Sequence, residues 1–355
     1  MTWVIIIAGF IVLIVLHEAG HFTAAKAVGM RVERFALFFP PLIVKKKIGE
    51  TEYGIGAIPA GGYVKISGMN PAEDLPDEVR TRAYYAQPVW KRIVVVAAGP
   101  FVNLVIAFVV LLIFWGALGA PQATKQVGSL LPGFPADGVL QKGDRIISVD
   151  GQRGDQEKIS KLISSHKCAE QPPTNGCVAQ TAAVLKVERH GKVVTVSIRP
   201  KYEAAEKRML VGFGYAVTHQ PKALGPAISA SASDFWYVAR QTLSLPARIF
   251  NSQERKQISG VVGVSDVAHT TIQTDAALAV RLLAIVSLSL AIVNLFPFLP
   301  LDGGHIFWAV VELFRRRPVP YSVMERAGVI GFFLVIMLFF IGLTNDIGRI
   351  NSGGF

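Results

Sequence analysis

The chain has 355 residues, of which 51% are hydrophobic and only 17% are charged, and its formal net charge is +11. Soluble globular domains carry about 25% charged residues, so this composition excludes a disordered chain and an ordinary soluble enzyme. Two cysteines are too few for a disulfide scaffold or a thiolate metal cluster. In so apolar a chain, excess Lys and Arg are expected first in loops that flank membrane spans, and we expect no nucleic-acid binding.

Four apolar stretches are candidates for membrane-spanning helices. A helix needs about 20 mostly apolar residues to cross a hydrocarbon core of about 30 Å. The stretches cover residues 2–28, 93–118, 276–298 and 327–343. The sequence therefore predicts a polytopic α-helical membrane protein with four transmembrane helices.

Basic residues set the expected orientation of these helices. Lys and Arg crowd the connection between the first two stretches, including the run at 45–47, and three arginines at 315–317 follow the third stretch. By the positive-inside rule both connections face the cytoplasm. Both termini and the segment 120–275 are then expected on the extracytoplasmic side.

Residues 120–202 are expected to form one small β-rich domain outside the membrane. Alternating apolar runs at 145–149 and 192–198 follow the strand period, and Asp-Gly and His-Gly pairs mark turns. The stretch 138–151, GVLQKGDRIISVDG, resembles the core of PDZ domains, which bind an extended chain at the edge of a sheet.

The segment 203–275 is expected to be an extracytoplasmic tether. Residues 234–250 within it have apolar side chains at helical spacing. Such an amphipathic helix would either lie at the outer membrane surface or pack against the PDZ domain. Residues 1–119 and 276–355 then hold the two pairs of transmembrane helices.

Cys168 and Cys177 lie in a loop of the expected outer domain that has no strand pattern. Outside the cytosol, a disulfide that closes this short loop is expected, and it would stabilise the domain by roughly 2–3 kcal/mol. Two free thiols are the alternative.

The motif HEAGH at residues 17–21 interrupts the first apolar stretch and carries the strongest chemical signal. On a helix, positions i and i+4 share a face, so His17 and His21 can bind one ion while Glu18 reaches a water on it. Two imidazoles, a third protein ligand and one open position are typical of catalytic zinc. Ionisable residues within a span cost about 2.5–3.5 kcal/mol each, and a metal or a water-filled cavity would offset this cost.

A third zinc ligand is expected where the third apolar stretch breaks, in the segment 294–305, NLFPFLPLDGGH. The prolines remove backbone donors, and the glycine pair permits backbone shapes closed to other residues. Irregular backbone at membrane depth is tolerated only where it is buried in protein or lines a cavity. Asp302 is the predicted oxygen ligand, and His305 is the competing candidate.

These two motifs, in this order, resemble those of the site-2 protease family of intramembrane zinc metalloproteases. The bacterial branch of regulator of sigma-E proteases (RseP type) is the most similar. The resemblance covers nearly the whole chain, including a Gly-rich loop at 54–65, the segment AGPFVN at 98–103 and the PDZ insertion. The best-known enterobacterial members carry two PDZ domains, whereas one fits here, and the segment 260–265 replaces a Gly-Pro-containing turn of the relatives.

The resemblance implies a role for each motif residue. His17, His21 and Asp302 would hold Zn²⁺, and Glu18 would be the general base that activates water and later protonates the leaving amine.

The resemblance also implies a set of substrate contacts. The second motif would contact the substrate backbone, with Asn294 near the reacting carbonyl and Pro297 beside it. The Gly-rich loop resembles a membrane-associated β-hairpin of the family that pairs with an unwound substrate strand, through Gly61, Gly62 and Tyr63.

The function implied is regulated intramembrane proteolysis in a bacterial cytoplasmic (inner) membrane. A single-spanning membrane protein would be cut after a first extracytoplasmic cut, with an anti-sigma factor, in a stress response, or a remnant signal peptide as substrate. We expect a monomer whose partners are this substrate and the lipid bilayer. Two alternatives remain: a catalytically inactive PDZ-bearing membrane scaffold, which would not need Glu18, and a quality-control membrane metalloprotease, whose third ligand is usually Glu.

Overall fold

The computed structural model describes residues 2–70, 72–170 and 172–351, which form two compact units. The helical unit comprises residues up to Gly119 and from Pro221 onward, and the β-rich unit comprises Ala120–Gln220. The β-rich unit thus extends past the expected boundary at residue 202. It does so because its last strand pairs with its first along most of their length.

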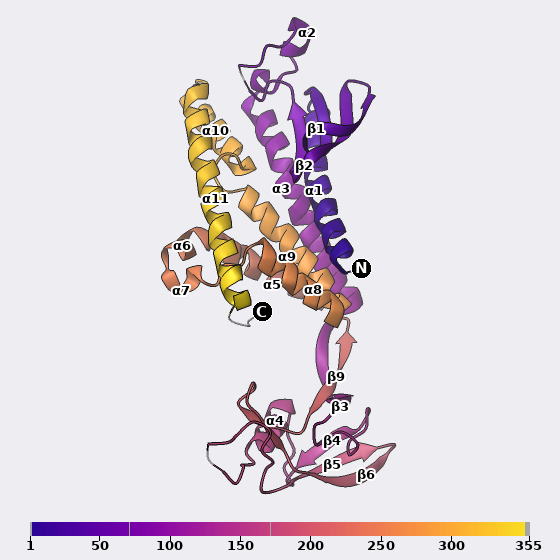
Figure 1. Cartoon of the computed structure of the whole chain (residues 1–355). Coiled ribbons are helices and arrows are strands. Elements are labelled where there is room, and N and C mark those ends of the chain that lie inside the picture. The colour runs from indigo at the N-terminus through magenta and orange to yellow at the C-terminus, as the bar shows by residue number, and fades with distance from the viewer. Residues whose placement is uncertain (1, 71, 171, 352–355) are drawn as a thin grey trace. The chain divides into compact units, whose positions relative to one another are not determined.

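Four helices of the helical unit are long and apolar enough to cross a membrane, which makes this a multi-pass membrane protein (Figure 1). The third ends at Asn294, earlier than expected, and the fourth gains polar turns beyond the apolar run 327–343. The helices are α1 (Thr2–Ala27), α3 (Val89–Ile113) with its π-helical continuation (Phe114–Leu118), α9 (Ala276–Asn294) and α11 (Tyr321–Asn351).

Helices α1 and α3 approach each other closely at two glycines. A Cβ atom on Gly20 would lie 2.6 Å from the carbonyl oxygen of Ala98, and one on Gly99 would overlap the imidazole of His21. Close approach at small residues is usual between membrane helices. One face of α3 therefore lies directly behind the HEAGH motif.

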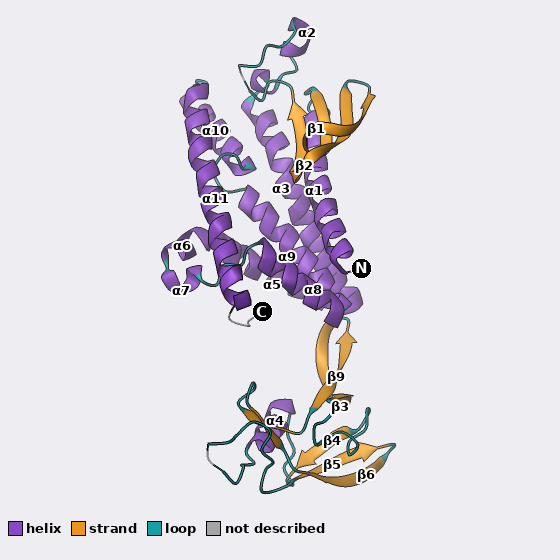
Figure 2. Cartoon of the chain, viewed as in Figure 1, coloured by secondary structure: helices purple, strands orange, loops and turns teal. Residues whose placement is uncertain are grey.

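The Gly-rich segment lies in the second strand of an antiparallel sheet, which follows the C-terminal end of α1 (Figure 2). Its strands are β1 (Val32–Ile48) and β2 (Thr51–Ile66). Both bend, so that residues 32–37 pair with 51–55 on one side and with 62–66 on the other. In the described part of the chain no further strand pairs with 62–66, which leaves that segment as a sheet edge.

An acidic residue in the turn of this sheet attaches it to the rest of the helical unit. Glu50 accepts hydrogen bonds from both terminal nitrogens of Arg82, at 2.8 and 2.9 Å, and from Lys26 at the end of α1. The Arg82 guanidinium, together with Lys26, lowers the pKa of Glu50 to about 2. The carboxylate is therefore charged at any physiological pH, and the attachment persists.

From Pro221 onward, the segment expected to be a tether folds into helices of the helical unit. The buried face of α5, with Val238 and Ala239, packs against Ala107 of α3 and Leu288 of α9. The expected amphipathic helix at 234–250 thus begins earlier and covers membrane helices. The helices are α5 (Leu224–Leu243), α6 (Leu245–Phe250), α7 (Ser252–Arg255) and α8 (Val261–Thr274).

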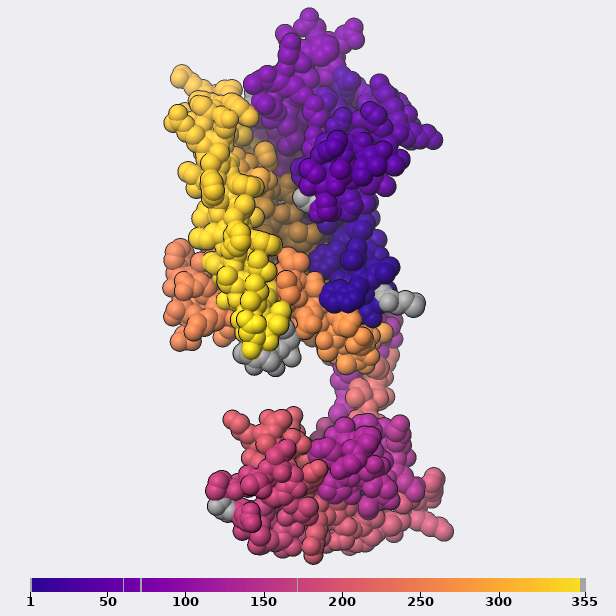
Figure 3. Space-filling view, in the orientation of Figure 1, coloured from indigo at the N-terminus to yellow at the C-terminus, as the bar shows by residue number. Residues whose placement is uncertain are grey.

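Helix α11 is fixed at its C-terminal end by a buried carboxylate. Asp346 accepts hydrogen bonds from the backbone N–H groups of Gly260 and Gly263, at 3.0 and 2.8 Å, and so caps the start of α8. A Cβ on Gly342 would lie 2.7 Å from Cα of Gly260. The segment 260–265, whose role the sequence left open, is thus where α8 meets α11. In Figure 3 the side chains of α11 form a column along one edge of the unit.

The β-rich unit is a five-stranded sheet of order β6-β5-β4-β3-β9 with one covering helix, α4 (Gln156–Ser164). The alternating runs at 145–149 and 192–198 are strands β4 and β6, as predicted. Cys168 and Cys177 are joined by a disulfide. The strands of this sheet are β3 (Ala120–Leu130), β4 (Arg145–Val149), β5 (Ala183–Arg189), β6 (Lys192–Ile198) and β9 (Phe213–Gln220). A separate two-stranded sheet consists of β7 (Lys201–Glu203) and β8 (Arg208–Leu210).

Candidate active site

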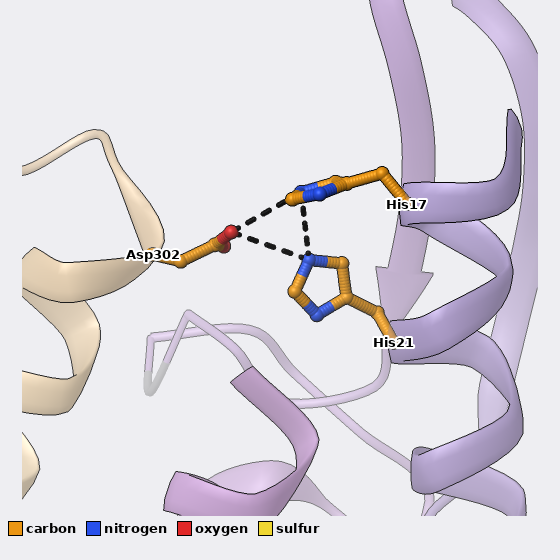
Figure 4. Close-up of side chains that lie close together, drawn as sticks. All are labelled: His17, His21 and Asp302. Carbon is orange, nitrogen blue, oxygen red and sulfur yellow. Dashed lines mark hydrogen bonds and ion pairs between the residues drawn. The ribbon is translucent and has the colours of Figure 1, made fainter. Parts of the chain in front are cut away.

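Helix α1 presents two imidazoles to one point in the interior of the helical unit. His17 and His21 are four residues apart, so they lie on one helix face, and both are buried. Their Nε2 atoms lie 3.2 Å apart. Figure 4 shows both rings directed at a carboxylate that comes from a different part of the chain.

That carboxylate is Asp302, in the first turn of α10 (Asp302–Arg315). Its Oδ2 atom lies 3.2 Å from Nε2 of His17 and 3.4 Å from Nε2 of His21. The helix break predicted after Asn294 is present, since α9 ends there and α10 begins at Asp302. His305, the competing candidate, is not part of this cluster of ligand atoms.

The two glycines after Asp302 let the chain fold back onto its own turn. A Cβ on Gly303 would overlap the carbonyl of Leu295, and one on Gly304 would overlap the backbone of Leu299. Residues 295–301 therefore pack directly on the first turn of α10. This contact fixes the place at which Asp302 enters the site.

The three ligand atoms have the spacing of a tetrahedral zinc site. With metal–ligand bonds of about 2.0–2.1 Å, neighbouring ligand atoms of a tetrahedron lie about 3.3 Å apart. The observed separations of 3.2, 3.2 and 3.4 Å agree with this value. A zinc ion would accept lone pairs from both imidazoles and from the carboxylate. His17, His21 and Asp302 thus fit a zinc ion by both geometry and donor type.

Sequence comparison gives the family. The sequence pattern of peptidase family M50 matches residues 5–338. The chain belongs to peptidase family M50. Three relatives are named "Putative zinc metalloprotease". The one from Campylobacter jejuni is 28% identical, over 95% of this chain and 91% of the relative. The one from Clostridium perfringens is 29% identical, over 95% of this chain and 96% of the relative. The one from Mesorhizobium japonicum is 30% identical, over 95% of this chain and 95% of the relative. This M50 protein is a zinc metalloprotease, and zinc is its cofactor.

A backbone carbonyl of α3 orients the second histidine of the M50 site. Nδ1 of His21 lies 2.9 Å from the carbonyl oxygen of Val95, which can only accept, so Nδ1 carries the proton. Nε2 of the neutral ring then has a free lone pair, and this is the atom that faces His17 and Asp302. Support of this kind from outside the ligand set fixes the tautomer of metal-binding histidines.

The predicted base and the predicted hairpin meet at this site. Gly62, on the sheet edge of β2, lies so close to Glu18 that a Cβ on residue 62 would overlap its side chain. Gly61 adopts a φ of +125°, which favours glycine, and the Tyr63 ring lies 5.4 Å from the ring of Phe39. Of the three predicted hairpin residues, Gly62 is thus the one that the structure brings against a residue of the HEAGH motif.

The second motif reaches the site through one of its two predicted contact residues. The carboxamide nitrogen of Asn294 lies 3.4 Å from Nε2 of His17. Pro297 lies in the exposed turn between α9 and α10. Its place is therefore in the loop that carries the chain from Asn294 to Asp302.

Sequence reasoning missed the contribution of α3 to the M50 site. Val95, Gly99 and Asn103 lie at positions i, i+4 and i+8 of this helix and share the face turned to α1. The first contacts His21 through its carbonyl, the second leaves room for the His21 ring, and the third approaches His17. The sequence signal that could have indicated this contribution is Asn103, a polar residue within an otherwise apolar part of the span.

Proposed function

We propose that this M50 metalloprotease is an intramembrane endopeptidase of the site-2 protease type, with His17, His21 and Asp302 as zinc ligands. The observation that carries the proposal is the convergence of these three donors, within 3.2–3.4 Å, on helices of a unit built around four candidate membrane spans. A zinc site that is formed partly by a spanning helix acts on peptide bonds brought into the membrane.

Glu18 is proposed as the general base. When bound, zinc would act as a Lewis acid that polarises a carbonyl group and lowers the pKa of water. Glu18 takes the proton of the attacking water as its oxygen bonds to the peptide carbon, and passes it to the amide nitrogen as the C–N bond breaks. Both products, a carboxylate and an amine, are thereby accounted for.

Asn294 is proposed to contact the reacting peptide. Its carboxamide lies beside Nε2 of His17, on the side of the site that α9 closes. An amide N–H donor there would stabilise the charge that develops on the substrate carbonyl oxygen. Pro297 is proposed to shape the turn that carries the chain from Asn294 to Asp302.

The sheet edge at residues 62–66 is proposed to bind the substrate backbone as an added strand. A substrate helix hides its carbonyls in internal hydrogen bonds, so it must unwind before cleavage, and a strand edge satisfies the freed groups. The contact between Gly62 and Glu18 supports this assignment, because a substrate strand that pairs with the sheet edge at Gly62 would lie close to the proposed base. Gly61 and Tyr63 flank this position.

The β-rich unit is proposed to be the PDZ domain that the sequence resembles. A groove of about 210 Å³ lies between α4 and residues 208–215, with Ile159 and Ile163 on one wall and Leu210 and Phe213 on the other. A groove between a helix and a strand suits an extended peptide. The disulfide-linked residue Cys168 packs on Met209 behind it, together with Ala179.

In the cell, the protein is proposed to act in regulated intramembrane proteolysis, as a monomer in a bacterial cytoplasmic membrane. The termini and the β-rich unit would be extracytoplasmic, and the basic connections cytoplasmic. A single-spanning protein already cut outside the membrane, such as an anti-sigma factor or a remnant signal peptide, is the proposed substrate.

The test compares wild-type protein with Glu18→Gln in liposomes that contain a single-span reporter. Glu18→Gln is expected to bind one zinc per chain and to lose at least about 100-fold in cleavage rate, as removal of a general base does. Metal analysis on the same samples provides the control. Cleavage at the wild-type rate by Glu18→Gln would refute the assigned base. Failure of the wild-type protein to cut any membrane-span reporter would favour the scaffold alternative.

A further inference from the structure

A buried carboxamide on α3 faces His17, the zinc-site histidine that accepts no support from a backbone carbonyl within residues 2–70, 72–170 and 172–351. Asn103 is fully buried, and its Nδ2 atom lies 3.4 Å from Nδ1 of His17. The side-chain oxygen of Asn103 has no hydrogen-bond partner among the residues that the structure describes. A buried, unpartnered amide oxygen costs about 1–3 kcal/mol, so this arrangement calls for a physical explanation.

The direction of this hydrogen bond decides whether His17 can bind zinc. If the amide nitrogen donates to Nδ1, the neutral ring of His17 must carry its proton on Nε2, and a protonated nitrogen has no lone pair for a metal. Yet Nε2 is the atom that lies 3.2 Å from Asp302. A half-turn of the carboxamide about its Cβ–Cγ bond exchanges oxygen and nitrogen within the same shape. The oxygen then accepts from the Nδ1–H group of His17, so that the oxygen has a partner and Nε2 keeps its lone pair for the metal.

We propose that Asn103 is a positioning residue of the zinc site. Its side-chain oxygen accepts the Nδ1–H of His17, fixes the ring tautomer and keeps the Nε2 lone pair directed at the metal. The inference rests on the proposed role of His17 as a zinc ligand.

The packing around Asn103 suits this role. Its backbone carbonyl accepts a hydrogen bond of 2.9 Å from Ser287 of α9, which holds this turn of α3 in place. Two turns earlier, Val95 makes the equivalent contact with His21. Helix α3 thus supports both imidazoles from one face, with a backbone acceptor for one ring and a side-chain acceptor for the other.

The expected effect is on metal affinity. Loss of a partner that orients a zinc-bound histidine typically lowers metal affinity or activity by about 10–100-fold. Asn103→Leu keeps the volume and removes the acceptor, so zinc affinity measured against a chromogenic chelator should fall within that range. Asn103→Asp keeps an acceptor oxygen and should retain most of the affinity. Ser231→Ala, which removes a buried hydroxyl of α5 that bonds within its own helix, should bind zinc as the wild type does.

Two spectroscopic measurements separate positioning from packing. Cobalt-substituted Asn103→Leu should show a changed visible spectrum, whereas cobalt-substituted Asn103→Asp should resemble the wild type. In zinc-free wild-type protein labelled with ¹⁵N-histidine, the neutral His17 ring should be protonated at Nδ1, a result that needs no variant to fold.

Specific outcomes would overturn the proposal. These are wild-type zinc affinity in Asn103→Leu, equal losses in the Asp and Leu variants, or a neutral His17 ring protonated at Nε2 in the zinc-free protein. Retention of zinc by His17→Ala would instead show that the proposed ligand set is wrong.

Discussion

The backbone of Gly62 lies against the side chain of Glu18, with no room for a Cβ atom between them. One residue belongs to the sheet edge of β2 and the other to the HEAGH motif of α1. The sheet edge and the proposed base are therefore in direct contact.

Gly62→Ala should displace Glu18 and slow cleavage. Misplacement of a catalytic group by about 1 Å can cost about 100-fold in rate, so we expect a loss of at least about 10-fold in reporter cleavage. Bound zinc should be unchanged, because the ligands lie on other residues. Gly225→Ala is the matched control, since a Cβ at Gly225 meets no atom within 4 Å. Equal cleavage by Gly62→Ala and wild type would show that the contact is not needed.

The choice between Asp302 and His305 as third ligand can be made by metal analysis. Asp302→Ala should lose most of the bound zinc, because it leaves the two histidines without their third donor. His305→Ala, three residues further along α10, should keep one zinc per chain. The opposite pattern would assign the third ligand to His305.

An ion pair holds α10, the helix that carries Asp302, against α3. Arg92 donates two hydrogen bonds to Glu312, at 3.0 and 2.5 Å, and both side chains are largely buried. Breaking a buried pair by neutralising one partner costs about 3–5 kcal/mol, so Glu312→Gln should clearly lower the thermal unfolding temperature. Part of that loss should return in the double exchange of Arg92→Glu with Glu312→Arg. Arg315→Gln, at an exposed position of the same helix, serves as control.

The β-rich unit should lose stability at acidic pH through Asp144. This carboxylate is buried and accepts hydrogen bonds from Nε and a terminal nitrogen of Arg189, at 2.8 and 2.7 Å. The Arg189 guanidinium holds the pKa of Asp144 below its ordinary value. A folded-state pKa that is lowered contributes stability above the unfolded value of about 3.9, and this contribution disappears as pH falls through the folded value.

Amide hydrogen exchange of residues 120–220 in the full chain measures this effect. Asp144→Asn should weaken protection at neutral pH by about 1–3 kcal/mol and flatten the acid dependence. Glu188→Gln, which removes an exposed pair with Arg145, should leave the profile unchanged. An unaltered acid profile in Asp144→Asn would exclude Asp144 as the responsible group.

The sequence was informative where one local rule dominates. Apolar run length predicted four spans, although it missed the polar turns of α11 that precede residue 327 and follow residue 343. Helical spacing predicted the shared face of His17 and His21, and the proline and glycine pattern predicted the break before Asp302.

The sequence was silent where contacts join distant segments. The hydrogen bonds by which Asp346 caps α8 join residues that are 83 and 86 positions apart in the sequence. No periodicity in the sequence predicts such contacts. Most of the expected tether became the helices α5 to α8, of which α5 packs its apolar face on α3 and α9, a contact that only the folded unit reveals. The approach of Asn103 to His17 likewise depends on the packing of α3 against α1, which the sequence alone does not give.

Helix α3 holds both imidazoles from a single face, and this has a mechanical consequence. An axial slide of α3 along α1 by one helical turn is about 5.4 Å, more than a hydrogen bond of 2.9 Å tolerates. Such a slide would separate Val95 from His21 and Asn103 from His17 at once. The two helices can tilt together as one rigid body. They cannot slide past each other by a turn without breaking the contacts that orient both imidazoles.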